Sequence, residues 1–238
     1  MTTNRFVKAL KRFIFGIFGW PIRERSSANS VAMPKVVVVK TAIAKPRASR
    51  WYMTQGMLSF LQLIRKHEGG SQDSVAYNAD YAMDDRWTLT SATFDQVRRL
   101  GRSQVSEHGE ASSAIGAYQF LSKTLDSLKM SLGLSGSETF DQNLQDDLAV
   151  ALMIRRGLLT YLRGDMTSVA FANSLAREWA SLPVVHAMKG SRRMLKAGQS
   201  YYAGDGLNRA FHDPEDVLEA ILAIKTDVTI QYAKDLKP

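Results

Sequence analysis

The chain has 238 residues, of which 45% are hydrophobic and 23% are charged, and this ordinary globular composition excludes wholesale disorder. It has no cysteine, which excludes a disulfide scaffold, thiolate metal sites and thiol catalysis. Because no run approaches ~18 uninterrupted apolar residues, we expect no ordinary membrane-spanning helix.

The net charge of +8 is concentrated at the start of the chain. Residues 1–50 contain eleven Lys and Arg residues and a single acid, Glu24, for a net charge of +10, whereas residues 51–238 carry a net charge of −2. We therefore predict a basic N-terminal arm and linker over residues 1–50 and a nearly neutral domain over residues 51–238. Since the excess charge describes only the arm, nucleic acid is not an expected partner.

The arm is predicted to contain an amphipathic helix over residues 6–20. Its apolar face carries Phe6, Leu10, Phe13 and Ile17. Such a helix suits an anionic membrane surface or a virion protein. Two alternatives stay open: a helix docked on the protein's own core or on a neighbouring subunit, and a secretory signal cleaved after residues 30–32. The charged residues 23–25 argue against the signal.

The domain carries five apolar stripes at helical spacing, over residues 57–68, 118–132, 144–155, 169–179 and 217–228. Gly69, Gly133 and Gly157 end the first three stripes, and Pro183 stops the fourth. Asp213 and Pro214 provide an N-cap and a first helical position for the fifth. The pattern therefore predicts a mainly helical domain.

Residues 71–113 lack helical spacing for the most part. Polar residues such as Asn78 and Asp80 interrupt short extended pieces around Tyr77 and residues 87–89. A small sheet or a long loop fits this region. The expected fold class is mainly α, with a small irregular or β lobe and a ligand cleft between the two parts.

Glu68 is the most informative residue of the domain. It falls on the apolar face of the first predicted helix, immediately before the glycines that end that helix. Burial disfavours the charged carboxylate, and the helix C-terminus places partial negative charge beside it, so both effects raise its pKa. A carboxylic acid that stays protonated near neutral pH can act as a general acid. The alternative is an ordinary last-turn Glu that points to solvent or bonds a neighbour.

Three segments together resemble the bacteriophage lambda endolysin family. These are His67-Glu68-Gly69, the stretch Ser113–Leu121 with its Gly-x-Tyr-Gln motif, and the Trp-Ala-Ser-Leu-Pro box over residues 179–183. The resemblance covers about residues 53–200 and implies a lysozyme-like fold of the α+β kind. The chain departs from the family pattern at Ala117, where Arg is usual, and at Val184, where Gly is usual, and residues 94–109 do not align.

The resemblance implies cleavage of the β-1,4 bond between N-acetylmuramic acid and N-acetylglucosamine in peptidoglycan. It implies Glu68 as the catalytic acid of a lytic transglycosylase, which forms a 1,6-anhydromuramoyl end and needs no second carboxylate. A hydrolysing muramidase instead uses two carboxylates. Asp84, Asp85 and Glu107 are the candidates for a second one.

The resemblance also implies substrate-binding residues, namely Ser113, Tyr118, Gln119, Trp179, Ser181 and Leu182. Gln119 can donate to and accept from a sugar N-acetyl group or hydroxyl. Tyr118 is either a cleft residue or a core aromatic, and Trp179 has the same two interpretations. Ser113 is expected to cap a helix or shape the turn before Tyr118 rather than to react.

We expect no cofactor and no metal, because the four histidines show no metal-ligand spacing. Residues 198–204 form a polar-aromatic loop that either lines the cleft or only connects. The function predicted is that of a phage peptidoglycan-cleaving enzyme in the virion or the host cell envelope. A structural or ejected virion protein with a lysozyme-like domain and a non-cutting glycan-binding module are the alternatives.

Overall fold

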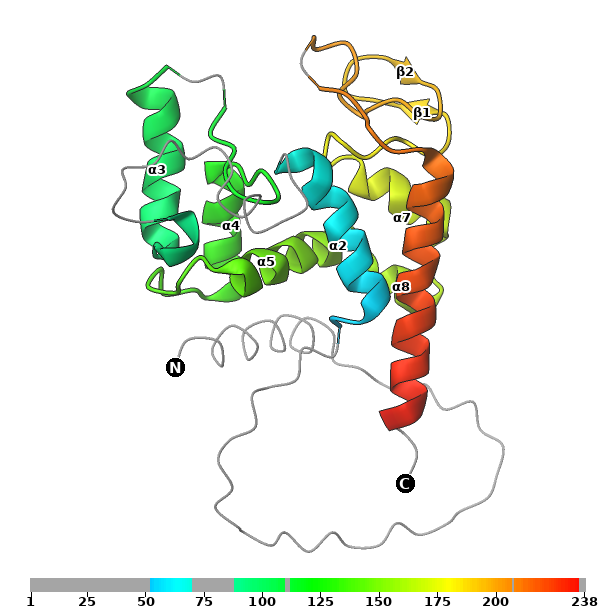
Figure 1. Ribbon diagram of the computed structural model, residues 1–238. Coiled ribbons are helices and arrows are strands. Elements are labelled where there is room, and N and C mark those ends of the chain that lie inside the picture. The colour runs from blue at the N-terminus through cyan, green and yellow to red at the C-terminus, as the bar shows by residue number, and fades with distance from the viewer. Residues whose placement is uncertain (1–51, 70–87, 110–111, 207, 236–238) are drawn as a thin grey trace, which may run out of the picture.

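The computed structural model describes residues 52–69, 88–109, 112–206 and 208–235 (Figure 1). The predicted arm over residues 1–50 and the candidate carboxylates Asp84 and Asp85 lie outside these residues. Among the helices that the model describes, none is both long enough and apolar enough to cross a membrane.

Within the described residues the fold is mainly helical with one small antiparallel sheet, which confirms the predicted fold class. The helices are α2 (Gln55–Glu68), α3 (Phe94–Ser106), α4 (Ser122–Leu132), α5 (Gln142–Arg155), α6 (Leu158–Arg163), α7 (Ser168–Leu175) and α8 (Pro214–Asp235), with a short 3-10 turn at Leu89–Ser91. The sheet consists of β1 (Met188–Lys189) and β2 (Met194–Leu195).

The helices form two groups on either side of α5, which runs through the middle of the molecule (Figure 1). Helices α2 and α8 lie side by side with α6 and α7 close to them, and α3 packs on α4 in the other group. Residues 144–153 of α5 are all buried. The sequence predicted one apolar stripe on this helix, but a central helix is surrounded on every face.

The contact between α2 and α8 is close. A Cβ atom on Gly56 would lie 2.7 Å from the carbonyl carbon of Ala223, so only glycine allows the two backbones to approach this far. The Gly56 N–H donates to Asp227 Oδ2 at 2.6 Å. Val217, Ile221 and Ile224 of α8 are fully buried against the rest of the core.

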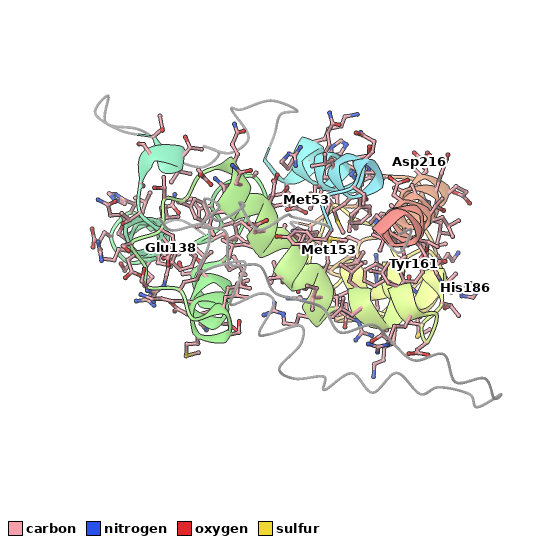
Figure 2. The ribbon with its side chains drawn as sticks, turned by 90° about the horizontal axis from the view of Figure 1, so that it is seen from below. Met53, Glu138, Met153, Tyr161, His186 and Asp216 are labelled. Atoms are coloured by element: carbon pink, nitrogen blue, oxygen red, sulfur yellow. The ribbon has the colours of Figure 1, made fainter. Side chains whose placement is uncertain are left out.

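Helix α6 joins the same group through Tyr161. Figure 2 shows this side chain beneath α8, and its hydroxyl donates to the Ile221 carbonyl at 3.2 Å. A buried tyrosine hydroxyl requires a partner, and here the partner belongs to α8. Helix α8 is therefore part of the hydrophobic core.

Ion pairs connect α3 to α4. Lys129 Nζ lies 2.7 Å from both carboxylate oxygens of Asp95, and Arg98 Nη1 lies 2.7 Å from Asp95 Oδ1. Arg98 also donates to Asp126, from Nε at 2.7 Å, and Arg102 donates to the same carboxylate at 2.5 Å. These side chains are partly exposed, so water and salt reach the cluster.

Two predicted helix boundaries were wrong. The second apolar stripe was expected to start a helix at Tyr118, but α4 begins at Ser122 and residues 116–119 form a turn. The fourth stripe was expected to stay helical to Trp179, but α7 ends at Leu175 and turns follow. In both places the neighbouring turn also buries apolar side chains. The apolar spacing therefore indicates which residues are buried and does not show where the helix begins or ends.

The irregular region predicted over residues 71–113 contains a helix that the sequence analysis missed. Thr93 caps α3 and forms a capping box with Gln96. Only Phe94, Val97 and Gly101 of this helix are buried, so its apolar stripe is narrow. The described part of this region forms no sheet, and the described strands instead lie within residues 188–195.

Candidate active site

Glu68 is the last residue of α2, and Gly69 follows as the C-cap. The first turn of the helix is held by Thr54, whose hydroxyl accepts from the Met57 N–H at 3.3 Å. The Glu68 side chain is partly buried, and its Oε1 accepts a hydrogen bond from the Ser181 N–H at 3.0 Å. The carboxyl group of α2 is thus fixed against the segment that follows α7.

Burial raises the pKa of the Glu68 carboxyl group above its ordinary value, although interactions with the Ser181 hydroxyl and N–H act in the opposite direction. The net direction is the one expected from the sequence. A raised pKa keeps the proton on the acid at higher pH, and the N–H of Ser181 stabilises the carboxylate that remains once the proton has left. The group can therefore give up a proton and take one back.

The Trp-Ala-Ser-Leu-Pro box forms a tight turn around Ser181. The Trp179 N–H donates to the Leu175 carbonyl at 3.1 Å, and the Leu182 N–H donates to the Trp179 carbonyl at 3.2 Å. The side chains of Trp179 and Leu182 are both buried. These two side chains anchor the turn in the core. The turn therefore points the Ser181 N–H toward the Glu68 carboxylate.

Tyr118 is a core aromatic, which is one of its two predicted roles, the other being a cleft residue. Its ring is buried, and its hydroxyl donates to Asp146 Oδ1 at 2.6 Å. Arg65 Nη1 donates to the Tyr118 hydroxyl at 2.8 Å and lies 3.4 Å from Asp146 Oδ1. The network ties α2, three residues before Glu68, to α5 and to the turn that carries Gln119. No motif in the sequence indicates the hydrogen bond between Arg65 and Tyr118.

Gln119 has a left-handed backbone, with φ of 49°, and it is the only non-glycine residue of the described chain with positive φ. Such a conformation costs on the order of 1–3 kcal/mol and persists only where the surroundings impose it. Here the Gln119 N–H donates to the Gly116 carbonyl at 3.1 Å, and the Ala117 N–H donates to Gln145 Oε1 at 2.9 Å. The Gln119 side chain is partly buried, and its Nε2 donates to the Gly116 carbonyl at 3.2 Å.

Ser113 lies at the start of α4. Its Oγ accepts from the Ser122 N–H at 3.1 Å, and Ser122 is the first residue of that helix. The N-cap position itself is Leu121, whose side chain forms no cap. Ser113 therefore supplies, from nine residues earlier, the acceptor that the first turn needs.

The polar-aromatic loop over residues 198–204 packs against the segment after the box. The Val184 N–H donates to the Gln199 carbonyl at 2.8 Å, and the Gly198 N–H donates to the Val184 carbonyl at 2.9 Å. The Ser191 N–H donates to the Tyr201 carbonyl at 3.1 Å, which brings in the connection between β1 and β2. The loop therefore packs with Val184 and with the β1–β2 connection, and these segments follow directly after the turn that contacts Glu68.

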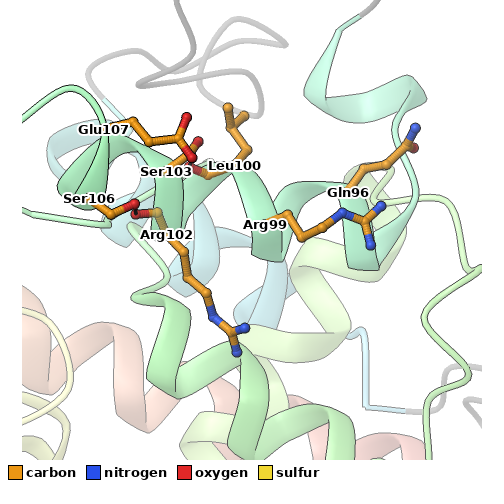
Figure 3. Close-up of a pocket in the computed structure, with 7 residues that line it drawn as sticks. All are labelled: Gln96, Arg99, Leu100, Arg102, Ser103, Ser106 and Glu107. Carbon is orange, nitrogen blue, oxygen red and sulfur yellow. Dashed lines mark hydrogen bonds between the residues drawn. The ribbon is translucent and has the colours of Figure 1, made fainter.

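Glu107 lies at the C-cap of α3 and is exposed. Figure 3 shows it on a groove of about 450 Å³ along this helix, lined by Gln96, Arg99, Leu100, Arg102, Ser103, Ser106 and Glu107. Among the described residues, no carboxylate acts on the pKa of Glu68. The described part of the chain also contains no group of three His, Asp or Glu residues arranged to hold a metal ion.

The described residues form a mainly helical, lysozyme-like fold. In it, the partly buried Glu68 carboxyl group bonds to the backbone of a buried turn at Ser181. Residues 58–207 match the sequence model of the family described as Endolysin, and the chain belongs to that family. No curated protein and no solved structure matches the chain. The protein is therefore a phage enzyme that degrades the peptidoglycan of the bacterial cell wall. The matched segment contains Glu68, Gln119 and the box, and it ends before α8.

Proposed function

We propose that the protein is a lytic transglycosylase that cleaves the β-1,4 bond between N-acetylmuramic acid and N-acetylglucosamine, with Glu68 as its catalytic acid and base. The observation that carries the proposal is a partly buried carboxyl group with a raised pKa, bonded to the Ser181 N–H at 3.0 Å. The resemblance of the three motifs to the lambda endolysin family supplies the bond that is cut.

The reaction begins with protonated Glu68. The acid gives its proton to the glycosidic oxygen, the bond from this oxygen to C1 of the muramoyl residue breaks, and C1 becomes oxocarbenium-like. The Glu68 carboxylate then removes the proton from the muramoyl 6-hydroxyl, whose oxygen attacks C1 and closes the 1,6-anhydro ring. The proton returns to Glu68, so one residue completes the cycle without a water nucleophile.

Two opposing effects suit Glu68 to both steps. Burial favours the protonated acid needed for bond cleavage. The Ser181 N–H favours the carboxylate that must remove a proton in the second step. A pKa near the working pH gives the best compromise between the two roles.

We propose that Gln119 contacts the substrate, through the N-acetyl group or the reacting 6-hydroxyl, because its amide both donates and accepts. Its left-handed backbone is a cost that a purely connecting turn would avoid. Tyr118 and Ser113 hold this turn through their bonds to Asp146 and Ser122. Trp179 and Leu182 anchor the turn that carries Ser181, and among the described residues only Ser181 bonds to the Glu68 side chain.

The variant Glu68→Gln tests the catalytic role. It keeps the size of the side chain and an acceptor for the Ser181 N–H but removes the transferable proton, so lysis of purified cell walls should fall by at least about 10²-fold. The matched control is Glu219→Gln, an exposed residue on α8, which should lyse walls like the parent. Near-parental lysis by a folded Glu68→Gln protein would refute the assignment.

The reaction type is tested on the products. Mass spectrometry of muropeptides should find 1,6-anhydromuramoyl ends, about 18 Da lighter than hydrolysed products because no water is added. Reducing muramic acid as the main product would instead indicate a hydrolase with a second carboxylate. Glu107, Asp84 and Asp85 would then be replaced by their amides in turn.

A further inference from the structure

An aromatic cluster lies next to Glu68 and includes a residue beyond the family match. The ring of Phe211 stacks on that of His67 with centroids 5.0 Å apart and an interplanar angle of 2°. His212 meets the His67 ring edge-on, at 4.6 Å and 79°. His67 precedes Glu68 in α2, so the cluster adjoins the proposed acid directly.

A chain of two hydrogen bonds through the Ser181 backbone connects the Phe211 backbone to the Glu68 side chain. The Phe211 N–H donates to the Ser181 carbonyl at 2.9 Å, and the Ser181 N–H donates to Glu68 Oε1 at 3.0 Å. Ser181 is buried, so this link is well packed. The Phe211 ring is therefore held at a fixed position relative to the carboxyl group.

Phe211 is 58% exposed as a residue even though His67 stacks on one face of its ring. It is the only aromatic among the large hydrophobic residues that are exposed in the described chain. Leaving a phenyl ring in water forgoes the free energy of burying it. The Phe211 ring stacks on His67 with one face and lies near Glu68, the proposed catalytic acid. Its other face is therefore available to bind a ligand.

The two histidines make this surface uncharged. Burial, helped by the positive charges of His67 and Lys66 and opposed by a hydrogen bond to the Leu63 backbone and by Asp216, lowers the pKa of His212 to about 4. Burial and the charge of Lys66 also lower the pKa of His67. The uncharged form of His212 therefore dominates at neutral pH, and both shifts favour uncharged imidazole rings behind Phe211.

We propose that Phe211, backed by His67, is a sugar-binding platform that takes one pyranose ring of the glycan strand beside the scissile bond. The proposal rests on the proposed function of Glu68. A β-1,4-linked N-acetylhexosamine carries its hydroxyl and acetamido groups around the ring edge, so its two faces present axial C–H groups. Packing such a face on the exposed side of Phe211 removes apolar surface of both partners from water.

Binding is measured with Glu68→Gln protein, which keeps the site but prevents turnover. Isothermal titration with peptide-free peptidoglycan glycan strands should show about tenfold weaker binding for Glu68→Gln/Phe211→Ala, equivalent to about 1.4 kcal/mol. Glu68→Gln/Phe211→Trp should keep the parental affinity, because indole offers a larger flat face. The matched control is Glu68→Gln/Leu222→Ala, which removes a side chain of similar exposure on α8 and should bind normally.

A packing role would be detected by thermal unfolding. As Phe211 is mostly exposed, Phe211→Ala should leave the midpoint of thermal unfolding close to that of the parent. With Glu68 intact, this variant should raise KM on purified sacculi and largely keep kcat. Unchanged strand affinity in Phe211→Ala, equal losses in the Ala and Trp variants, or no binding by the parent would each overturn the platform. The Glu68 assignment is tested separately, since its failure is lysis by Glu68→Gln.

Discussion

The contact between α2 and α8 and the contact between α3 and α4 are made by different kinds of atoms. In the first, two backbones approach over Gly56, and the α8 residues Val217, Ile221 and Ile224 are fully buried. In the second, Asp95 and Asp126 pair with three basic side chains at a partly exposed surface. Glu68 belongs to the first group, at the end of α2.

The difference indicates which half is sensitive to salt. Partly exposed ion pairs contribute little, about 0–1 kcal/mol each, and salt screens them. A hydrogen bond from Lys129 and the pairing with Arg98 hold the pKa of Asp95 below its usual range, against the effect of burial. Apolar packing has no such dependence. The half that carries Glu68 should therefore keep its geometry at salt concentrations that loosen the packing of α3 on α4.

The largest effect is expected from Gly56→Ala. The new methyl group would lie 2.7 Å from the Ala223 carbonyl carbon, and backbone has no way to yield cheaply, so we expect a loss of about 3 kcal/mol, at the upper end for overpacked sites. Urea unfolding measures the loss, and wall lysis should fall because α2 carries Glu68.

Gly133→Ala is the matched control for Gly56→Ala. A Cβ atom at Gly133 meets nothing within 4 Å, but φ is 61°, so only a backbone cost of about 1–2 kcal/mol is expected. Equal losses in the two variants would mean that the close approach of α2 and α8 does not matter to stability.

The second effect concerns pH. The pKa of His212 is about 4 in the folded protein and 6.5 in the unfolded chain, so the unfolded chain binds more protons between these values. The contribution of neutral His212 is present above pH 6.5 and is lost as the pH falls toward 4. The ceiling is about 3 kcal/mol, and partial exposure reduces it.

His212→Phe keeps an aromatic ring but cannot titrate. Urea unfolding at several pH values should show that this variant loses less stability than the parent between pH 6.5 and 4.5. His186→Phe, at an exposed position, is the control and should follow the parent. A parental pH profile in His212→Phe would exclude His212 as the source of the dependence.

The smallest effect is expected from Asp126→Asn in the outer group. The variant removes the charge that Arg98 and Arg102 share, so the loss should be no more than about 1 kcal/mol at low salt. The difference from the parent should shrink in about 1 M NaCl, where the Debye length is about 3 Å. Wall lysis should stay parental, whereas a large loss of activity would show that the two groups are coupled.

Helical spacing in the sequence was sufficient to predict the helices whose buried side is broad. The stripes starting at Met57 and Val217 correspond to α2 and α8, and Gly133 ends α4 in a left-handed conformation, as expected. Helix α3 was missed because few apolar residues stand among its many polar and charged ones, although its Thr93–Gln96 capping box was readable. Local spacing does not tell how far a helix extends once buried turns follow it.

The site was predictable only in part. Periodicity placed Glu68 on an apolar face, but its partner Ser181 is 113 residues further along the chain, and only the family resemblance indicated the box. The left-handed backbone of Gln119 and the bond between Arg65 and Tyr118 depend on tertiary packing, so no local pattern reports them. Phe211 lies beyond the region of resemblance, where the sequence offered no motif.

Helix α8 lies outside the segment that matches the endolysin family but inside the hydrophobic core of the domain. Homology to the endolysin family ends at residue 207, yet Val217, Ile221 and Ile224 complete the core, and the Tyr161 hydroxyl finds its acceptor on α8. A fragment cut where the homology ends would expose the flank of α2 at Gly56 and leave that hydroxyl unpaired. We therefore expect the folding unit to extend beyond the segment that matches the family, because α8 supports the helix that carries Glu68.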